Sequence, residues 1–177
     1  MDKIVKTGPR LQFRQAVPED MDYIMEVDHR PGNAEFVIPY TRAVHQLTLD
    51  GESATHLIIE CRTTGEKVGM LMIAGLDNPS REIEWTRIIL DDKGKGYGHE
   101  TLKMLKSWAF DDLHFHRAWL DCKDHNARAL HVYESEGLQR EALLRETILT
   151  DGVYENLIIL AILDREYEAR KEQGLEL

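Results

Sequence analysis

A glycine-rich stretch offers the clearest chemistry in this chain. It is the run Lys93-Gly94-Lys95-Gly96-Tyr97-Gly98. An apolar run, residues 85–90, precedes it, and a segment with helical patterning, residues 99–112, follows it and begins with His99. A strand that turns through glycines into a helix exposes several backbone N–H groups beside the positive end of the helix dipole. Glycines let a ligand approach the backbone closely, and the two lysines add positive charge. The stretch therefore predicts a site for a phosphate or pyrophosphate group.

The spacing of the glycines distinguishes between several phosphate loops. A P-loop needs Gly, four residues, and Gly-Lys followed by Ser or Thr, and the chain has no such run. In the dinucleotide fingerprint Gly-x-Gly-x-x-Gly, the third glycine would be replaced by His99 or Thr101. A third pattern, a polar residue followed by x-x-Gly-x-Gly, fits Lys93, Gly96 and Gly98. It resembles the acetyl-CoA loop of the Gcn5-related N-acetyltransferases, with Lys in place of the usual Arg or Gln. A glycine turn that only caps a helix is the structural alternative.

This resemblance implies how acetyl-CoA would be held. Its pyrophosphate would lie on the backbone N–H groups of residues 93–98, at the start of the helix that His99 opens. The pantetheine amides would bond to the backbone of the preceding strand at Ile88, Ile89 and Leu90, as they do in the family. Acetyl-CoA is thus the expected co-substrate.

Tyr133 is the candidate general acid. It lies in His131-Val132-Tyr133-Glu134-Ser135-Glu136-Gly137-Leu138, which resembles the Leu-Tyr-Glu-x-x-Gly-Phe segment of the family. In many members that tyrosine reaches the thioester sulfur, and a phenol with a pKa near 10 is protonated at neutral pH. The same resemblance implies that Asn126 and Ala129 contact the pantetheine arm. Packing of Tyr133 and helix capping by Asn126 are the structural alternatives.

Glu84 is the candidate general base. The segment Ile83-Glu84-Trp85 resembles Ala-Glu-Phe in spermidine N-acetyltransferases and ribosomal-protein N-terminal acetyltransferases. In a strand, Glu82 and Glu84 point to one face while Ile83 and Trp85 point to the other. Two such carboxylates could take up the proton of a cationic amine or hold the amine in place. The structural alternative is that the two acids lie on a solvated sheet face. The catalytic alternative is that a chain of water molecules, and not Glu84, acts as the base.

Composition narrows the class of protein. The 177 residues, 42% of them hydrophobic, suit one packed domain. A net charge of −10 argues against nucleic-acid or anionic-membrane partners and is compatible with a cationic amine. Cys61 and Cys122 have no CxxC spacing, and residues 1–10 lack an apolar signal region, so we expect a reduced, cytoplasmic protein. The histidines lack the spacing of a zinc helix, so we expect no metal.

The order of predicted elements defines the fold class. It reads strand, two helices, a three-strand meander, helix, strand, helix and two closing strands, and only its middle alternates strand with helix. Over residues 11–163 this order resembles the N-acetyltransferase fold: an α/β (α+β) protein with a mixed, mostly antiparallel sheet flanked by helices. The resemblance implies that the strands before and after the glycine-loop helix run parallel and splay apart around coenzyme A. Residues 1–10 would be an N-terminal extension and residues 164–177 a polar helical tail.

Two functions of different classes remain open at this stage. The first is direct acetyl transfer from acetyl-CoA to a primary amine, and the second is a catalytically idle CoA-binding domain used for sensing or assembly. A nucleotide-binding α/β domain is disfavoured by the strand order. The acceptor could be a protein N-terminus, a polyamine or an amino-sugar antibiotic, and the segment that normally shapes its site, residues 21–49, carries no signature that decides between them. A homodimer is also left open.

Overall fold

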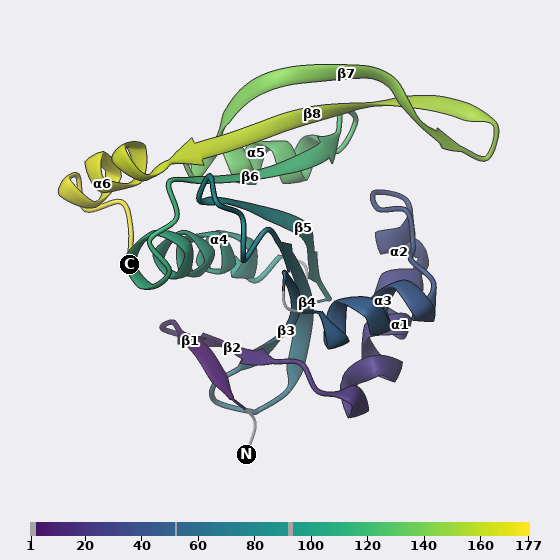
Figure 1. The fold of residues 1–177 in the computed structure, drawn as a ribbon, viewed down its shortest axis with the longest axis horizontal. Helices are drawn as coiled ribbons and strands as arrows, with labels where there is room; N and C mark the ends of the chain where they lie inside the picture. The colour runs from purple at the N-terminus through teal and green to yellow at the C-terminus, as the bar shows by residue number, and fades with distance from the viewer. Residues whose placement is uncertain (1–2, 52, 92–93) are drawn as a thin grey trace.

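One mixed sheet organises the chain. The computed structural model describes residues 3–51, 53–91 and 94–177, and within them eight strands pair in the order β1-β2-β3-β4-β5-β6-β8-β7 (Figure 1). All neighbouring strands are antiparallel except β5 and β6, which are parallel. The strands are β1 (Ile4–Thr7), β2 (Leu11–Gln15), β3 (Ala54–Cys61), β4 (Lys67–Ala74), β5 (Glu82–Leu90), β6 (Arg117–Lys123), β7 (Gln139–Thr150) and β8 (Val153–Leu163).

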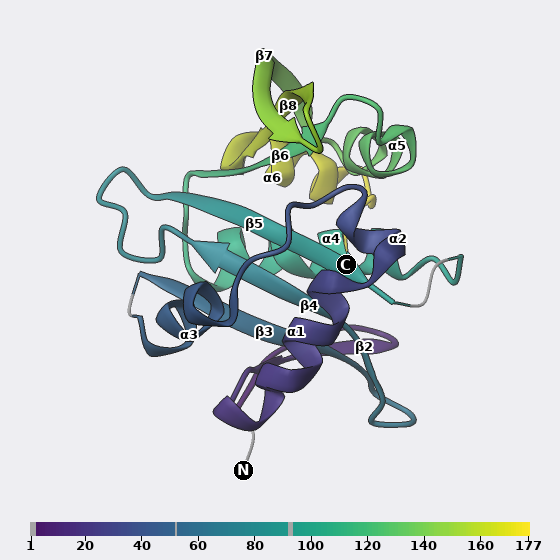
Figure 2. The ribbon, with the colours of Figure 1, turned by 90° about the vertical axis from the view of Figure 1, so that its right-hand side faces the viewer.

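The parallel pair divides the sheet into two halves. The pairing of β5 with β6 joins Glu82 to Arg117, Ile83 to Ala118 and Glu84 to Trp119. Beyond this short contact the half containing β1–β5 and the half containing β6–β8 turn away from each other (Figure 2). The splayed strands expected from the sequence are therefore present, and the part of β5 that follows Glu84 pairs only with β4 in the described register.

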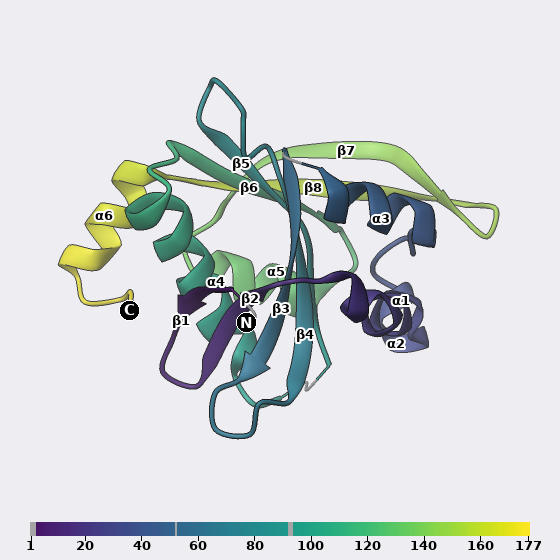
Figure 3. The ribbon, with the colours of Figure 1, turned by 60° about the horizontal axis from the view of Figure 1, so that its bottom comes forward.

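Helices cover both faces of the sheet. The helices α1, α2 and α3 lie on one side of β2–β5, and α4 lies on the other (Figure 3). Pro31 begins α2 at its first position, and the Thr41 side chain caps α3 by accepting from Val44 N. The helical elements are η1 (Pro18–Asp20), α1 (Met21–His29), α2 (Pro31–Ala34), α3 (Arg42–Asp50), α4 (Tyr97–Ser107), the π-helical turn η2 (Trp108–Asp112), α5 (Ala127–Ser135) and α6 (Asp164–Glu172).

Two apolar clusters, one on each face, hold these layers together. The larger joins the sheet to α4, α5 and α6, and includes Trp85, Leu105, Leu130 and Tyr167. The smaller joins the sheet to α1 through residues such as Ile24 and Ile89. Burial of these side chains is the main stabilising contribution to the fold.

The structure confirms the expected fold class and corrects several details. Residues 4–7, which the sequence places in an extension, form β1 and pair with β2. Residues 31–34 form the short helix α2 in the segment between α1 and α3. The helix expected over residues 99–112 begins at Tyr97 and ends in a π-helical turn, in which Leu113 N bonds to Trp108 O at 3.0 Å. Within the described residues, no helix is long and apolar enough to cross a membrane.

Candidate active site

The glycine loop has a left-handed backbone conformation and leads directly into α4. Gly94 and Gly96 have φ values of 96° and 74°, in the left-handed region that side chains disfavour. Gly96 is the N-cap of α4, so the free N–H groups of the first helical turn follow directly. Lys95, Gly96 and His99 are exposed. Lys93, also expected to contribute to the loop, lies outside the described residues.

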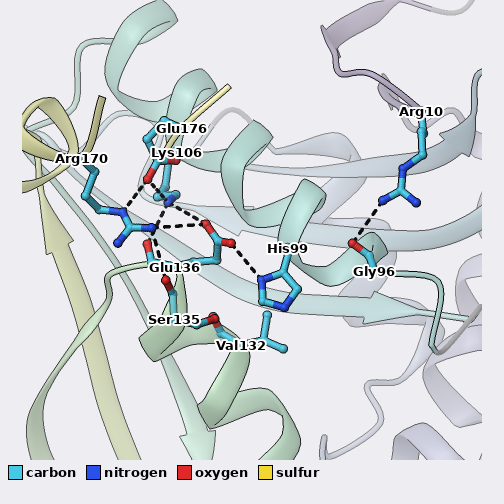
Figure 4. A network of polar contacts seen from close by, with 9 residues as sticks. All are labelled: Arg10, Gly96, His99, Lys106, Val132, Ser135, Glu136, Arg170 and Glu176. Atoms are coloured by element: carbon cyan, nitrogen blue, oxygen red, sulfur yellow. Dashed lines mark hydrogen bonds and ion pairs between the residues drawn. The ribbon is translucent and has the colours of Figure 1, made fainter. Parts of the chain in front are cut away.

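His99 is held from the side of the protein core. Its Nδ1 lies 2.9 Å from the Glu136 Oε1 atom (Figure 4). Glu136 is itself bound by the buried Lys106, whose Nζ lies 2.8 Å from the Glu136 carbonyl oxygen. One nitrogen of the His99 imidazole is therefore hydrogen-bonded to a carboxylate that the protein holds in place. His99 lies in the first turn of α4, directly after the glycine loop.

The strand that precedes the loop carries a β-bulge. The register with β4 shifts between the pairs Met72–Arg87 and Ile73–Trp85, which leaves Thr86 as the additional residue. Before the bulge Trp85 faces the large cluster, and after it Ile88 and Leu90 face the same cluster while Ile89 packs against α1. The three residues expected to bind pantetheine thus lie along the splayed part of β5.

Tyr133 lies on α5 and packs against the large cluster on the α4 side of the sheet. Burial raises the pKa of its phenol, and the negative charge of Asp121 on β6 adds to the increase. A phenol with a raised pKa stays protonated at neutral pH, which is the state that a general acid needs. The packing of Tyr133 expected as the structural alternative is therefore present, and its role as general acid stays a prediction.

Glu84 and Asp121 form a pair of carboxylates on the opposite face. Glu84 alternates with Ile83 and Trp85, and Asp121 alternates with Leu120 and Cys122, all of which belong to the large cluster. Both carboxylates therefore point to the face of the sheet on which α1 and α3 lie, Glu84 half-buried and Asp121 exposed. Desolvation raises the pKa of Glu84, and the charge of Asp121 raises it further. Desolvation also raises the pKa of Asp121.

The sequence did not indicate Asp121 as a site residue. It has no motif around it, and its closeness to Glu84 depends on the parallel register of β5 and β6. Glu82, expected to assist Glu84, is instead engaged by Arg117, whose Nη1 lies 2.6 Å from the Glu82 Oε2 atom. Arg117 also binds Glu141. Asp121 is thus a better-placed partner for Glu84 than Glu82 is.

Asn126 caps α5, since its side-chain oxygen accepts from Ala129 N at 3.2 Å. The capping role expected as an alternative is therefore present. Ala129 is half-buried and packs on the large cluster. Cys122 is buried, and burial raises the pKa of its thiol to about 12.

The segment expected to shape the acceptor site is fixed by a buried polar network. Asp28 on α1 accepts from Tyr40 N at 2.7 Å and lies 2.8 Å from Arg87 Nη1 and 3.1 Å from His45 Nε2. The His45 ring also contacts His56 at 3.2 Å. These contacts hold α1, α3 and the segment between them against the sheet. Asp28 therefore acts in positioning these elements, and its carboxylate is not free to bind an acceptor.

The described residues contain no group of three or more His, Cys, Asp and Glu side chains arranged to hold a metal ion. The described residues do bring together four features: the N-terminus of α4 after the glycine loop, the splayed parallel pair β5 and β6, the phenol of Tyr133, and the carboxylates of Glu84 and Asp121. These features define a site that could hold an extended phosphorylated thioester between two sheet halves and exchange protons on both faces.

Comparison with known proteins agrees with this geometry. The family model described as an acetyltransferase (GNAT) domain matches residues 10–139. The chain belongs to the GNAT acetyltransferase family. It is 25% identical over 167 residues to a spermidine N(1)-acetyltransferase of Escherichia coli (strain K12), covering 90% of this chain and 89% of the relative.

Further relatives extend the comparison. The chain is 27% identical over 110 residues to a putative ribosomal N-acetyltransferase, YdaF, of Bacillus subtilis (strain 168), covering 60% of this chain and 59% of the relative. Its fold matches a spermidine N-acetyltransferase from Vibrio cholerae, crystallised with CoA and spermine, with a TM-score of 0.81 and 19% identity. This match covers 91% of the chain and 99% of that structure.

Proposed function

We propose that this acetyltransferase moves the acetyl group of acetyl-CoA directly to a primary amine, with Tyr133 as general acid and Glu84 as general base. The amine nitrogen attacks the thioester carbonyl, and the C–S bond breaks as the amide forms. The Tyr133 hydroxyl gives its proton to the departing thiolate. Glu84, directly or through water, takes the proton that the amine loses. No step is assigned to a metal ion.

The observation that carries this proposal is the placement of the two proton-transfer groups on opposite faces of the splay. Tyr133 lies on the α5 side, while Glu84 and Asp121 lie on the side of α1 and α3. A thioester threaded between β5 and β6 would have its sulfur toward the acid and its carbonyl open to an amine from the other face. The backbone N–H groups of residues 94–99 and the edge of β5 at Ile88, Ile89 and Leu90 would hold the rest of acetyl-CoA.

The acceptor in this proposal is a cationic small amine, with a polyamine as the first candidate. Two neighbouring carboxylates attract a positively charged amine and disfavour an anionic acceptor. The spermidine N(1)-acetyltransferase relative supports this choice. The ribosomal N-acetyltransferase relative keeps a protein N-terminus as the second candidate.

Release of free CoA tests the function. The protein is mixed with acetyl-CoA and a panel of polyamines, peptide N-termini and amino sugars, and the released thiol is followed with time. Amine-dependent release that Tyr133→Phe slows supports the proposal. Binding of CoA with no release from any amine would favour the idle CoA-binding domain instead.

A homodimer and a reduced cytoplasmic setting complete the proposal. The hairpin of β7 and β8 extends past the rest of the sheet (Figure 1) and exposes five large apolar side chains, Leu143, Leu144, Leu149, Val153 and Tyr154. Exposed apolar side chains on a protruding hairpin suit contact with a second copy. Both cysteines are free thiols, which suits a reducing compartment. Sedimentation of the purified protein gives its oligomeric state.

A further inference from the structure

Arg10, which lies outside the glycine loop, contacts the loop directly. Its Nη1 atom lies 2.8 Å from the Lys95 carbonyl oxygen, and its Nη2 atom lies 3.3 Å from the Gly96 carbonyl oxygen. Figure 4 shows the guanidinium reaching the carbonyl of Gly96. The guanidinium carbon also lies 5.0 Å from the centre of the Tyr97 ring. One side chain thus contacts three successive residues of the loop.

Arg10 is itself anchored to α4. Its Nε donates to Glu100 Oε2 at 2.7 Å, and its backbone N donates to Glu100 Oε1 at 2.6 Å. Glu100 is buried and also accepts from Leu11 N at 2.9 Å. The carboxylate therefore fixes the base of the Arg10 side chain, while the end of the guanidinium remains available for the loop carbonyls.

The contacts to the carbonyls determine where the loop N–H groups point. A trans peptide is planar, and its C=O and N–H bonds point in opposite directions. When Arg10 holds the carbonyls of Lys95 and Gly96, the N–H groups of Gly96 and Tyr97 must point away from Arg10. Those are two of the donors that would meet a pyrophosphate.

We propose that Arg10 is a positioning residue for cofactor binding: it orients the N–H groups of Gly96 and Tyr97 toward the pyrophosphate of the acyl donor. This inference rests on the proposed function. Because Arg10 acts through the loop, its effect falls on the affinity for the donor and not on the chemistry at Tyr133 and Glu84.

Three variants test the role of Arg10. Arg10→Gln removes the guanidinium, and Arg10→Lys keeps the charge but cannot bridge Glu100 and two carbonyls at once. Both should raise the Kd for CoA and the KM for acetyl-CoA about tenfold, because the loop N–H groups are no longer held in one orientation, with kcat within twofold. Arg62→Gln is the matched control, because Arg62 binds the carbonyl oxygens of Gly8 and Pro9 and not the loop. It should leave both constants unchanged.

A donor without pyrophosphate separates orientation of the loop from general damage to the fold. With acetyl-pantetheine as donor, Arg10→Gln should have the same kcat/KM as the wild type. An equal loss with both donors, or a wild-type Kd for CoA in Arg10→Gln, would overturn the inference. Wild-type affinity in Arg10→Lys would also overturn it, because charge alone would then suffice. Failure of the wild type to bind CoA would instead remove the proposed function itself.

Discussion

At the scale of single residues, the proposed reaction depends on one phenol. Tyr133→Phe removes the hydroxyl and keeps the ring that packs on the large cluster. We expect kcat to fall by about 10²–10⁴-fold, the usual contribution of a general acid, while the Kd for CoA changes less than twofold. Single-turnover kinetics and calorimetry measure the two quantities. An unchanged rate in the chemical step would assign the proton to another group.

Glu84→Gln tests the base without changing its size. Only about one alkylamine molecule in a thousand is neutral at pH 7.4, so the enzyme must remove a proton from the bound cation. We expect kcat/KM to fall most at low pH and to recover partly at high pH, where the free amine forms in solution. A loss of kcat/KM of equal size at every pH would indicate a structural role for Glu84. An unchanged kcat/KM would mean that water or another group is the base.

Asp121→Asn tests the coupling between the two carboxylates. The charge of Asp121 raises the pKa of Glu84, so its removal should lower that pKa. The base form of Glu84 would then persist to lower pH, and the acid limb of the kcat/KM profile should shift downward in pH. Thr147→Val, on the distant β7, is a control that should leave the limb in place. An acid limb unchanged by Asp121→Asn would exclude the coupling.

At the scale of elements, the sequence predicts what local pattern and spacing decide. The strand before the glycine loop and the two closing strands are present as expected, because alternating patterns and turn residues mark them in the sequence. The site residues that the sequence does not reveal are close together only because elements far apart in the chain pack side by side. Arg10 reaches the loop because β2 lies beside α4, and Asp121 meets Glu84 through the register of β5 and β6. Neither residue carries a local signal, so only the folded chain shows its role.

The C-terminal segment illustrates the same limit. Residues 164–177 read as a polar tail, yet Tyr167 is fully buried and Glu176 enters a charged cluster (Figure 4). Glu176 Oε1 lies 2.5 Å from Lys106 Nζ and 2.6 Å from Arg170 Nε. The cluster ties α6 and the end of the chain to α4 and to Glu136, which holds His99. Composition alone describes such a segment as solvated.

Glu176→Gln tests how much this cluster stabilises the protein. The change leaves the buried Lys106 and the half-buried Arg170 with only the Glu136 carboxylate. Breaking a buried ion pair typically costs about 3 kcal/mol in the free energy of unfolding. Urea denaturation at pH 7 measures the loss. Glu172→Gln, at an exposed position on α6, is the control and should cost less than about 0.5 kcal/mol. Equal stabilities of the two variants would show that the cluster contributes little.

At the scale of the whole molecule, a buried polar network connects the helical layer to the sheet. The same network makes the free energy of unfolding depend on pH. His56 on β3 faces His45 on α3, the Leu71 carbonyl on β4, and the charges of Asp28 on α1 and Arg87 on β5. Burial, reinforced by the positive charge of the surroundings, lowers the pKa of His56 to about 4. The unfolded chain, with a histidine pKa near 6.5, therefore binds this proton before the folded chain does.

The resulting pH dependence has a definite sign. The contribution of His56 to stability is complete above about pH 6.5 and is lost as the pH falls toward 4, by roughly 3 kcal/mol in total. Burial raises the pKa of Asp28, but the hydrogen bond with His45 and the charge of Arg87 together outweigh it and lower the pKa below its usual value. Asp28 therefore adds a loss of stability in the same direction but at lower pH. His56→Gln keeps a donor and an acceptor and removes the titration. We expect this variant to be less stable at pH 7 but to show a flatter dependence of unfolding free energy between pH 6.5 and 4. Denaturation series across that range decide the matter, since parallel curves for variant and wild type would show that His56 does not set the slope.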